Sequence, residues 1–238
     1  MRLESSPERW AFLPAVALAI RPGVASLRGQ VRWTGPVPPP AAEHRESDSY
    51  CRAFAAADDR PPLVSLDYGV RDAVVWLAPL AAPPRAPSWK SALVSFEKCS
   101  LSPRVQVASV GQVLEVVNRD GTLHSVRAHL GAVTVFNKSL RDAGAIPDEA
   151  QSTLEQPGIY TIRCDLHPWE RATVVVTSAA PAQLTSMDGN FNFDEIPPGL
   201  YTLGAWEEKA GISARRIELP GGESKAVLQL NQSFLARR

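Results

Sequence analysis

Seven residues between two strand-like runs constrain this chain more than any other segment: Cys164-Asp165-Leu166-His167-Pro168-Trp169-Glu170. The flanking runs, 158–163 and 171–177, are rich in β-branched residues, which favour strands. A thiolate and an imidazole three residues apart, on a short loop held by two strands, can converge on one ion. A second imidazole, His124, follows another strand-like run far upstream. One Cys and two His form the trigonal ligand set of a blue-copper electron-transfer site. The sequence therefore predicts a metal site on a β scaffold.

These residues resemble the cupredoxin family, which includes the plastocyanin- and amicyanin-like copper proteins. The resemblance rests on Cys164, His167, Pro168 and Arg171, followed by a Val-rich strand at 174–176. Upstream, residues 102–107 and 111–118 are similar to the paired strands that precede the first His ligand. The resemblance implies a cupredoxin Greek-key β-sandwich over residues 88–178 that binds one copper ion. It implies His124, Cys164 and His167 as ligands.

Two residues depart from the family pattern. Glu170 stands where the family carries a weak axial Met, and Ser125 replaces the Asn that often follows the first ligand. A carboxylate is a hard, anionic ligand, so it favours Cu(II) over Cu(I) and lowers the reduction potential. A coordinated Glu170 predicts a more tetragonal, less blue centre or a site that accepts zinc. The alternative is that Glu170 points to solvent and the site is three-coordinate or empty.

Residues next to the ligands have expected supporting roles. Asn118 is expected to fix the loop before His124 through side-chain hydrogen bonds, as Asn does in turns. Pro168 and Ser125 flank the ligands in the sequence. Trp169 is expected either in an apolar docking patch or packed against a neighbouring domain. His129 is expected on the solvent face of a strand.

The composition favours short strands joined by turns. The chain has 238 residues, 21 of them Pro and 15 Gly, and few apolar patterns of helical spacing. Lys plus Arg and Asp plus Glu both total 25, so the formal net charge is zero. We therefore expect neither nucleic acid nor an anionic membrane surface as a partner.

The N-terminal 26 residues are typical of a secretory signal. Residues 11–20 are mostly apolar and Val24-Ala25-Ser26 fits a small-residue cleavage site, although acidic residues offset the arginines before the run. The run is too short to cross a bilayer, which needs roughly 20 apolar residues. We expect a periplasmic or extracellular protein without a transmembrane segment; the alternative is a frayed tail or a misplaced start codon.

The three cysteines fit an exported copper protein. With Cys164 assigned to the metal by the family resemblance, Cys51 and Cys99 are expected to form a disulfide in an oxidising compartment. The alternative is a pair of buried reduced thiols in a cytosolic protein.

The two ends of the chain predict a second, smaller β-sandwich. Residues 26–35 and 72–77 indicate strands, and downstream an Asp188-Gly189 hairpin turn precedes the alternating Phe191 and Phe193. These segments resemble the carboxypeptidase regulatory-like domain, a transthyretin-like β-sandwich. We expect residues 27–87 and 179–238 to form this host, with the cupredoxin inserted; the alternative is two sequential domains. Residues 137–150 are expected to be a loop.

Three functions remain open from the sequence. The first is one-electron transfer or copper holding, with a redox partner protein. The second is a type-2-like copper site, as an enzyme or a storage variant, and the third is a cell-envelope interaction module with a degenerate or empty site. We expect a monomer, and an electron-transfer or binding protein rather than a catalyst.

Overall fold

Nearly all of the regular secondary structure among the described residues is β-strand, as expected from the sequence. A computed structural model describes residues 23–37, 48–54, 64–80, 91–141, 149–178 and 180–231. One 3₁₀ turn, η2 (Cys51–Ala53), accompanies the strands in these ranges. The strands are β1 (Ala25–Trp33), β2 (Val74–Pro79), β3 (Ala92–Phe96), β4 (Leu101–Ser102), β5 (Val105–Ser109), β6 (Val113–Asn118), β7 (His124–Leu130), β8 (Val133–Leu140), β9 (Glu149–Thr153), β10 (Gly158–Cys164), β11 (Arg171–Thr177), β12 (Ala182–Leu184), β13 (Asn190–Ile196), β14 (Gly199–Glu207), β15 (Gly211–Leu219) and β16 (Gly222–Leu230).

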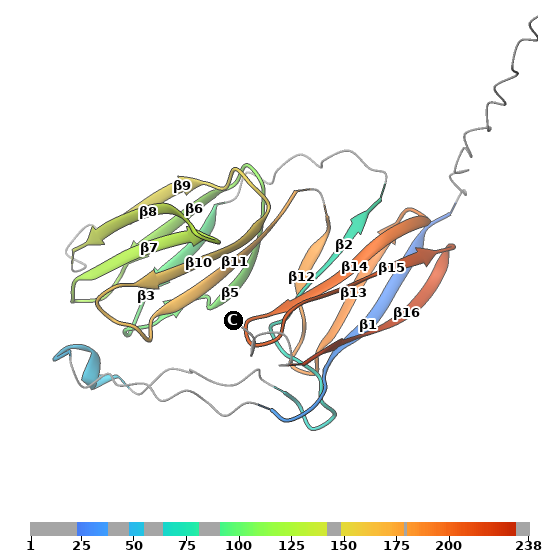
Figure 1. Cartoon of the computed structure of the whole chain (residues 1–238), viewed down its shortest axis with the longest axis horizontal. Helices are drawn as coiled ribbons and strands as arrows, with labels where there is room; N and C mark the ends of the chain where they lie inside the picture. Colours follow the sequence, from blue (N-terminus) through green and yellow to red (C-terminus); the bar gives the residue numbers. More distant parts are fainter. Residues whose placement is uncertain are drawn as a thin grey trace, which may run out of the picture.

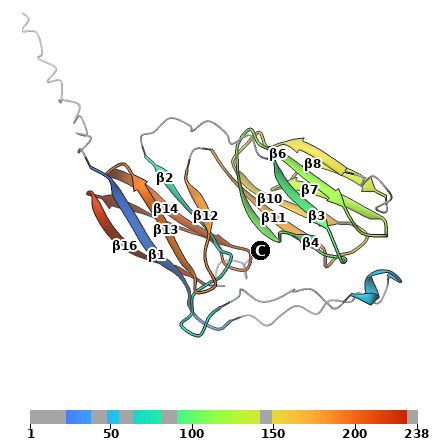
Figure 2. The ribbon, with the colours of Figure 1, turned by 180° about the vertical axis from the view of Figure 1, so that it is seen from behind.

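Strands β3 to β11 form one β-sandwich, here called the central sandwich. Its two sheets have the strand orders β5-β11-β10-β7-β8 and β4-β3-β6-β9. The alternation of buried and exposed positions along these strands turns one face of each sheet inward. Phe96, Leu114, Val126 and Ile162 are fully buried in the core between them. Figures 1 and 2 show these strands as one body beside a second group of strands.

The second group, here called the flanking sandwich, consists of β1, β2 and β12 to β16. Its sheets have the orders β13-β1-β16 and β12-β2-β14-β15. β1 runs antiparallel to β13, with Leu27 opposite Phe193, and parallel to β16. Trp33 and Leu203 are fully buried in its core, and Phe193 nearly so. Strands from before and after the central sandwich therefore share one core. Its likeness to the carboxypeptidase regulatory-like domain stays a prediction.

The chain passes from the flanking sandwich into the central sandwich, and back again, at two adjacent strands of the flanking sandwich. β2 precedes it and β12 follows it, and these strands pair antiparallel, with Trp76 opposite Ala182. Close ends are the condition under which a domain can be inserted into a surface loop. The two sandwiches also touch through Val175 and Trp206, and Arg104 forms an ion pair with Glu208 at 2.5 Å.

Two local predictions were wrong. Residues 137–150 were expected in a loop, but β8 continues to Leu140 and β9 begins at Glu149; positions 142–148 lie outside the described residues. Most residues of β8 are exposed or half-buried, so β8 lacks the alternation that marks a strand. The Asp188-Gly189 turn is present, but it joins β12 and β13, which lie in different sheets and do not form a hairpin. Gly189 has φ +76°, and a Cβ there would lie 2.5 Å from the Val31 carbonyl oxygen, so the turn needs glycine.

The predicted signal sequence lies almost wholly outside the described residues. Its last positions, Ala25 and Ser26, belong to β1, where Ala25 is fully buried opposite Ile196. Cleavage after Ser26 would therefore shorten β1 at its buried first residue. Among the residues that the structure describes, no helix is long and apolar enough to cross a membrane.

Candidate metal centre

Strand register brings the first His and the Cys together. β10 ends at Cys164 and β7 begins at His124, and the two strands pair antiparallel with Cys164 opposite Val126. Residues opposite each other point to the same face, and so do residues two apart on one strand. His124 and Cys164 therefore both face the interior of the central sandwich at one end, and both are buried.

The loop between β10 and β11 turns its remaining polar side chains inward. The Cys164 N–H donates to the Glu170 carbonyl oxygen at 3.2 Å, and the Glu170 N–H donates to the His167 carbonyl oxygen at 2.9 Å. The Asp165 N–H also donates to the Ser125 carbonyl oxygen at 2.8 Å, which ties the loop to β7. These bonds close the loop on itself, so the His167 and Glu170 side chains lie close to Cys164 and are buried.

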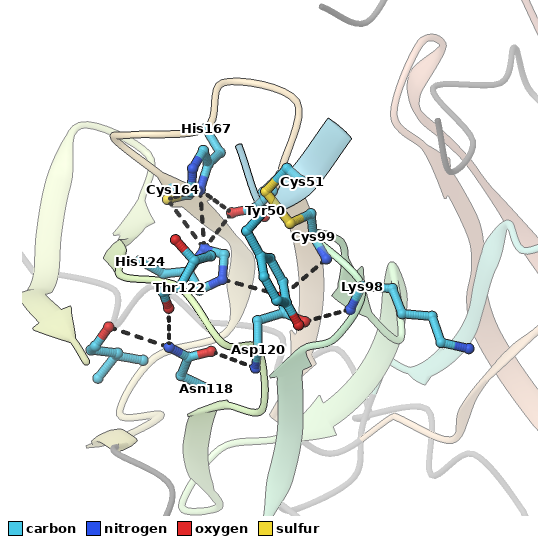
Figure 3. A network of polar contacts seen from close by, with 12 residues as sticks. Tyr50, Cys51, Lys98, Cys99, Asn118, Asp120, Thr122, His124, Cys164 and His167 are labelled. Atoms are coloured by element: carbon cyan, nitrogen blue, oxygen red, sulfur yellow. Dashed lines mark hydrogen bonds and ion pairs between the residues drawn. A yellow bond between two sulfur atoms is a disulfide. The ribbon is translucent and has the colours of Figure 1, made fainter. Parts of the chain in front are cut away.

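Three nitrogen and sulfur atoms converge at this end of the sandwich. His124 Nδ1 lies 3.1 Å from His167 Nδ1, and Cys164 Sγ lies 3.6 Å from His167 Nδ1 and 3.9 Å from His124 Nδ1. Bonds of about 2.0 Å to nitrogen and 2.3 Å to sulfur, placed trigonally, imply edges of about 3.5 Å and 3.7 Å. The observed triangle is therefore the size that one ion requires. Figure 3 shows the three side chains pointing toward one another.

Glu170 completes a closed set of four donors. Its Oε2 lies 2.9 Å from His124 Nδ1 and 3.3 Å from His167 Nδ1. The alternative that Glu170 points to solvent is wrong, because the residue is 1% exposed. Its second oxygen, Oε1, is buried and has no hydrogen-bond partner among the described residues. An orphaned carboxylate oxygen is costly in a protein interior, and a cation relieves that cost.

Both imidazoles have a carboxylate on the nitrogen that faces away from the cluster. Asp120 Oδ2 lies 3.2 Å from His124 Nε2, and Asp48 Oδ2 lies 3.3 Å from His167 Nε2. Neither aspartate was predicted from the sequence. Such outer carboxylates fix the ring orientation of metal-binding histidines and raise their basicity. Phe96 also stacks on the His124 ring, with ring centroids 4.0 Å apart.

The remaining predicted residues occupy the surroundings of the cluster. The Asn118 side chain donates to the Thr122, Leu140 and Arg141 carbonyl oxygens, and so fixes the loop before His124. Pro168 is exposed. Trp169 lies beside the His167 ring and donates from Nε1 to the Cys99 carbonyl oxygen at 3.2 Å.

Two further expectations concern the disulfide and His129. The structure contains the Cys51–Cys99 disulfide, which leaves Cys164 as the free thiol. His129 lies away from the cluster, with its Nδ1 3.5 Å from the exposed Thr134 hydroxyl.

In the metal-free cluster, the two imidazoles carry positive charge and the Glu170 carboxylate carries negative charge. Burial opposes a positive imidazole, but hydrogen bonds outweigh it: those to Asp120, Cys164 and Glu170 raise the pKa of His124 to about 11. Burial likewise opposes the charge on His167, yet its bonds to Cys164 and Glu170 raise its pKa to about 10. The same two imidazoles outweigh burial at Glu170 and lower the pKa of its carboxyl group. Metal-free, the cluster is therefore a compact set of ion pairs.

These shifts predict a pH optimum for the stability of the metal-free protein. The raised histidine pKa values contribute stability that is complete below about pH 6.5 and is lost as pH rises toward 10 or 11. The lowered Glu170 pKa contributes stability that is present above about pH 4.5 and is lost in acid. Between pH 6 and pH 9 we therefore expect the melting temperature of the metal-free protein to fall.

Thermal melts of metal-free protein at a series of pH values check this expectation. Glu170→Gln should flatten the profile, because it removes the anion from the cluster. His129→Ala is the matched control and should leave the profile unchanged. A melting temperature that is constant or rises from pH 6 to pH 9 would contradict the assigned charges.

Part of the chain is similar to solved structures. No family model and no curated protein matches the chain. Among solved structures, amicyanin from Paracoccus versutus is 19% identical, covering 42% of this chain and 97% of that chain, with a TM-score of 0.33. A purple cupredoxin from Nitrosopumilus maritimus is 21% identical, covering 37% and 100%, with a TM-score of 0.31. A Cu-containing nitrite reductase from Thermus scotoductus SA-01 is 23% identical, covering 42% and 25%, with a TM-score of 0.31. In its strand arrangement and in the place of its His–Cys–His cluster, the central sandwich is a cupredoxin-like domain.

Proposed function

We propose that the central sandwich is an exported copper-binding domain that carries single electrons or holds copper. Its ligands are His124, Cys164, His167 and Glu170. One observation carries the proposal: the four donor atoms all lie within 4.8 Å of one another and all four residues are buried. Glu170 Oε1 supports the proposal further, because this buried carboxylate oxygen has no hydrogen-bond partner among the described residues.

The donor set suits copper in both of its oxidation states. The Cys164 thiolate is a soft ligand that stabilises Cu(I), and imidazole binds both states well. The Glu170 carboxylate is hard and anionic, so it favours Cu(II). Bound copper would supply one-electron oxidation and reduction. We therefore expect a reduction potential below that of a centre with a neutral axial ligand.

The protein side of the site is rigid. His124 and Cys164 are the terminal residues of hydrogen-bonded strands, and the Phe96 ring stacks on His124. Asp120 accepts hydrogen bonds from the Lys98 and Cys99 N–H groups, at 2.6 and 2.9 Å, and so holds the outer nitrogen of His124 in place. A cage that is fixed before the metal enters limits the change in geometry between oxidation states, which favours fast electron transfer.

Export and the role of the flanking sandwich belong to the same proposal. A disulfide persists in an oxidising compartment, and the Cys51–Cys99 bridge supports a periplasmic or extracellular location. The flanking sandwich would then serve as a carrier or docking module, as its resemblance to the carboxypeptidase regulatory-like domain implies. Location can be checked by fractionating cells that produce the full chain and probing the periplasmic fraction. Recovery in the cytosol with reduced Cys51 and Cys99 would contradict export.

A zinc site is the second candidate, and the burial of Glu170 favours it. One thiolate, two imidazoles and one carboxylate form a closed four-donor set of the kind that structural zinc sites use. Zinc has no redox chemistry. The two proposals therefore differ in whether the loaded protein exchanges electrons.

Metal titration of the purified, metal-free full chain separates these functions. We expect one equivalent of Cu(II) to bind and to give a visible charge-transfer band that disappears reversibly on reduction. A weak or shifted band would indicate the type-2-like centre. Uptake of zinc in preference to copper would support the structural site, and no uptake of either would contradict a metal function. His129→Ala is the control, because this histidine lies outside the cluster.

A further inference from the structure

A segment from outside the central sandwich covers the metal centre. Residues 48–54, here called the cap segment, lie in the sequence between β1 and β2 of the flanking sandwich. In space, η2 of this segment lies at the ligand end of the central sandwich, away from the flanking sandwich (Figures 1 and 2). His167 is 4% exposed and its outer nitrogen faces the cap segment.

The cap segment is held by a covalent bond and by close packing. Cys51 and Cys99 are fully buried and form the disulfide, which Figure 3 shows beside the two histidines. The Tyr50 ring packs on Gly121, where an added Cβ would lie 3.0 Å from a ring carbon. The Phe54 ring packs on Tyr50, with centroids 5.2 Å apart.

Asp48 is the residue through which the cap segment reaches a ligand. Its Oδ1 accepts hydrogen bonds from the Tyr50 and Cys51 N–H groups, both at 2.8 Å. These two bonds aim the other oxygen, Oδ2, at His167 Nε2, 3.3 Å away. A proton held on Nε2 leaves the Nδ1 lone pair directed at the cluster, where a metal ion needs it.

Each cysteine of the disulfide donates its backbone N–H to one of the two carboxylates that orient the histidines. Cys51 N–H binds Asp48, the outer partner of His167. Cys99 N–H binds Asp120, the outer partner of His124. Asp120 belongs to the central sandwich itself, whereas Asp48 comes from the cap segment. Opening the disulfide is therefore expected to disrupt the contact between Asp48 and His167 before the contact between Asp120 and His124.

We propose that Asp48 is a positioning residue for the metal ligand His167, and that the Cys51–Cys99 disulfide keeps it in place. The oxidised bridge thereby holds a tight, covered metal centre. Two-electron reduction of the bridge to two thiols, by a dithiol reductant, would release the cap segment and loosen the metal. This inference rests on the proposed metal function and adds a coupling between disulfide state and metal retention.

The coupling can be measured as a rate of metal release. Full-length protein loaded with Cu(I) is mixed with excess bicinchoninate, and the coloured chelate is followed with time. We expect Asp48→Ala to release copper about 10–100-fold faster, because loss of an outer partner typically weakens metal affinity by that factor. The double variant Cys51→Ser with Cys99→Ser should accelerate release to a similar degree.

The decisive comparison is the triple variant. If the disulfide acts by holding Asp48, the triple variant should release copper no more than about twofold faster than Asp48→Ala alone, because coupled sites are not additive. Multiplicative effects, or wild-type release from Asp48→Ala, would overturn the proposal. Asp165→Ala is the matched control. The Asp165 carboxylate lies on the same loop as His167 but pairs with Arg127 at 2.6 Å, so its removal should leave the rate of copper release unchanged.

A metal-free measurement separates this inference from the proposed function. In the wild-type protein, the Nε2 proton of His167 should give a slowly exchanging downfield NMR signal, because Asp48 accepts it. The signal should vanish in Asp48→Ala and in the disulfide-free variant. Its persistence in the disulfide-free variant would overturn the coupling whatever the copper affinity, whereas absence of copper uptake by the wild type would overturn the metal function alone.

Discussion

Replacing Cys164 with serine is expected to abolish the intense visible band of the copper-loaded protein and to weaken Cu(I) binding about 100- to 1,000-fold. Structural sites with four ligands gain about 10–16 kcal/mol from the metal, so one ligand corresponds to about 3–4 kcal/mol. The thiolate is the soft member of the set and the source of the charge-transfer absorption. A visible spectrum and a competition titration with a Cu(I) chelator measure the two effects.

 Folding of the Cys164→Ser variant is checked separately, because serine places a hydroxyl group at a buried position. Cys164 is 4% exposed, and serine is close to cysteine in size, so we expect the metal-free variant to fold. Circular dichroism and a thermal melt check this. A visible band that survives in a folded Cys164→Ser protein would contradict the assignment of Cys164 as a ligand, since Cys51 and Cys99 are joined to each other.

The second large effect is expected from Glu170→Met, which should raise the reduction potential by about 100–200 mV and deepen the blue colour. At an effective dielectric constant near 20, two unit charges about 4 Å apart interact by about 4 kcal/mol. Each 1.4 kcal/mol of preference for one oxidation state shifts a one-electron potential by about 60 mV. Removing the carboxylate removes its preference for Cu(II), so the potential rises. A redox titration followed by visible absorption measures the shift.

Two further variants make the Glu170 result specific. Glu170→Gln keeps the shape and an oxygen donor but removes the charge, so its potential should fall between those of the wild type and Glu170→Met. Glu155→Met makes the same change at an exposed position and should leave spectrum and potential unchanged. If Glu170→Met leaves both where they were, the carboxylate does not act on the metal.

Three of the four clustered residues could be predicted together because Cys164, His167 and Glu170 share one loop between two strands. His124 lies 40 positions before Cys164, and only the family resemblance assigned it to the same site. Asp120 has a local signal that could have been used: it lies four residues before His124, in a turn closed by Asn118.

Asp48 could not have been predicted, because its contact depends on the tertiary fold. It lies 119 positions from His167, in a segment whose sequence indicates only a polar, irregular stretch. The disulfide holds Asp48 at the metal centre. A predicted disulfide does not indicate which side chains next to its cysteines will contact the site. The end of β8 was missed for a different reason: a strand with mostly exposed residues has no alternating pattern to detect.

The way β1 is paired also sets an order of events during synthesis. Gln30 bonds to Asp188, 158 positions later, and Thr34 bonds to Leu230, 196 positions later. Because the chain is synthesised at about 5–20 residues per second, these partners of β1 are made roughly 10–40 s after β1 itself. The central sandwich is contiguous in the chain and can fold within that interval. The central sandwich can therefore fold before the domain that surrounds it in the sequence, while the apolar face of β1 still lacks the strands that later cover it.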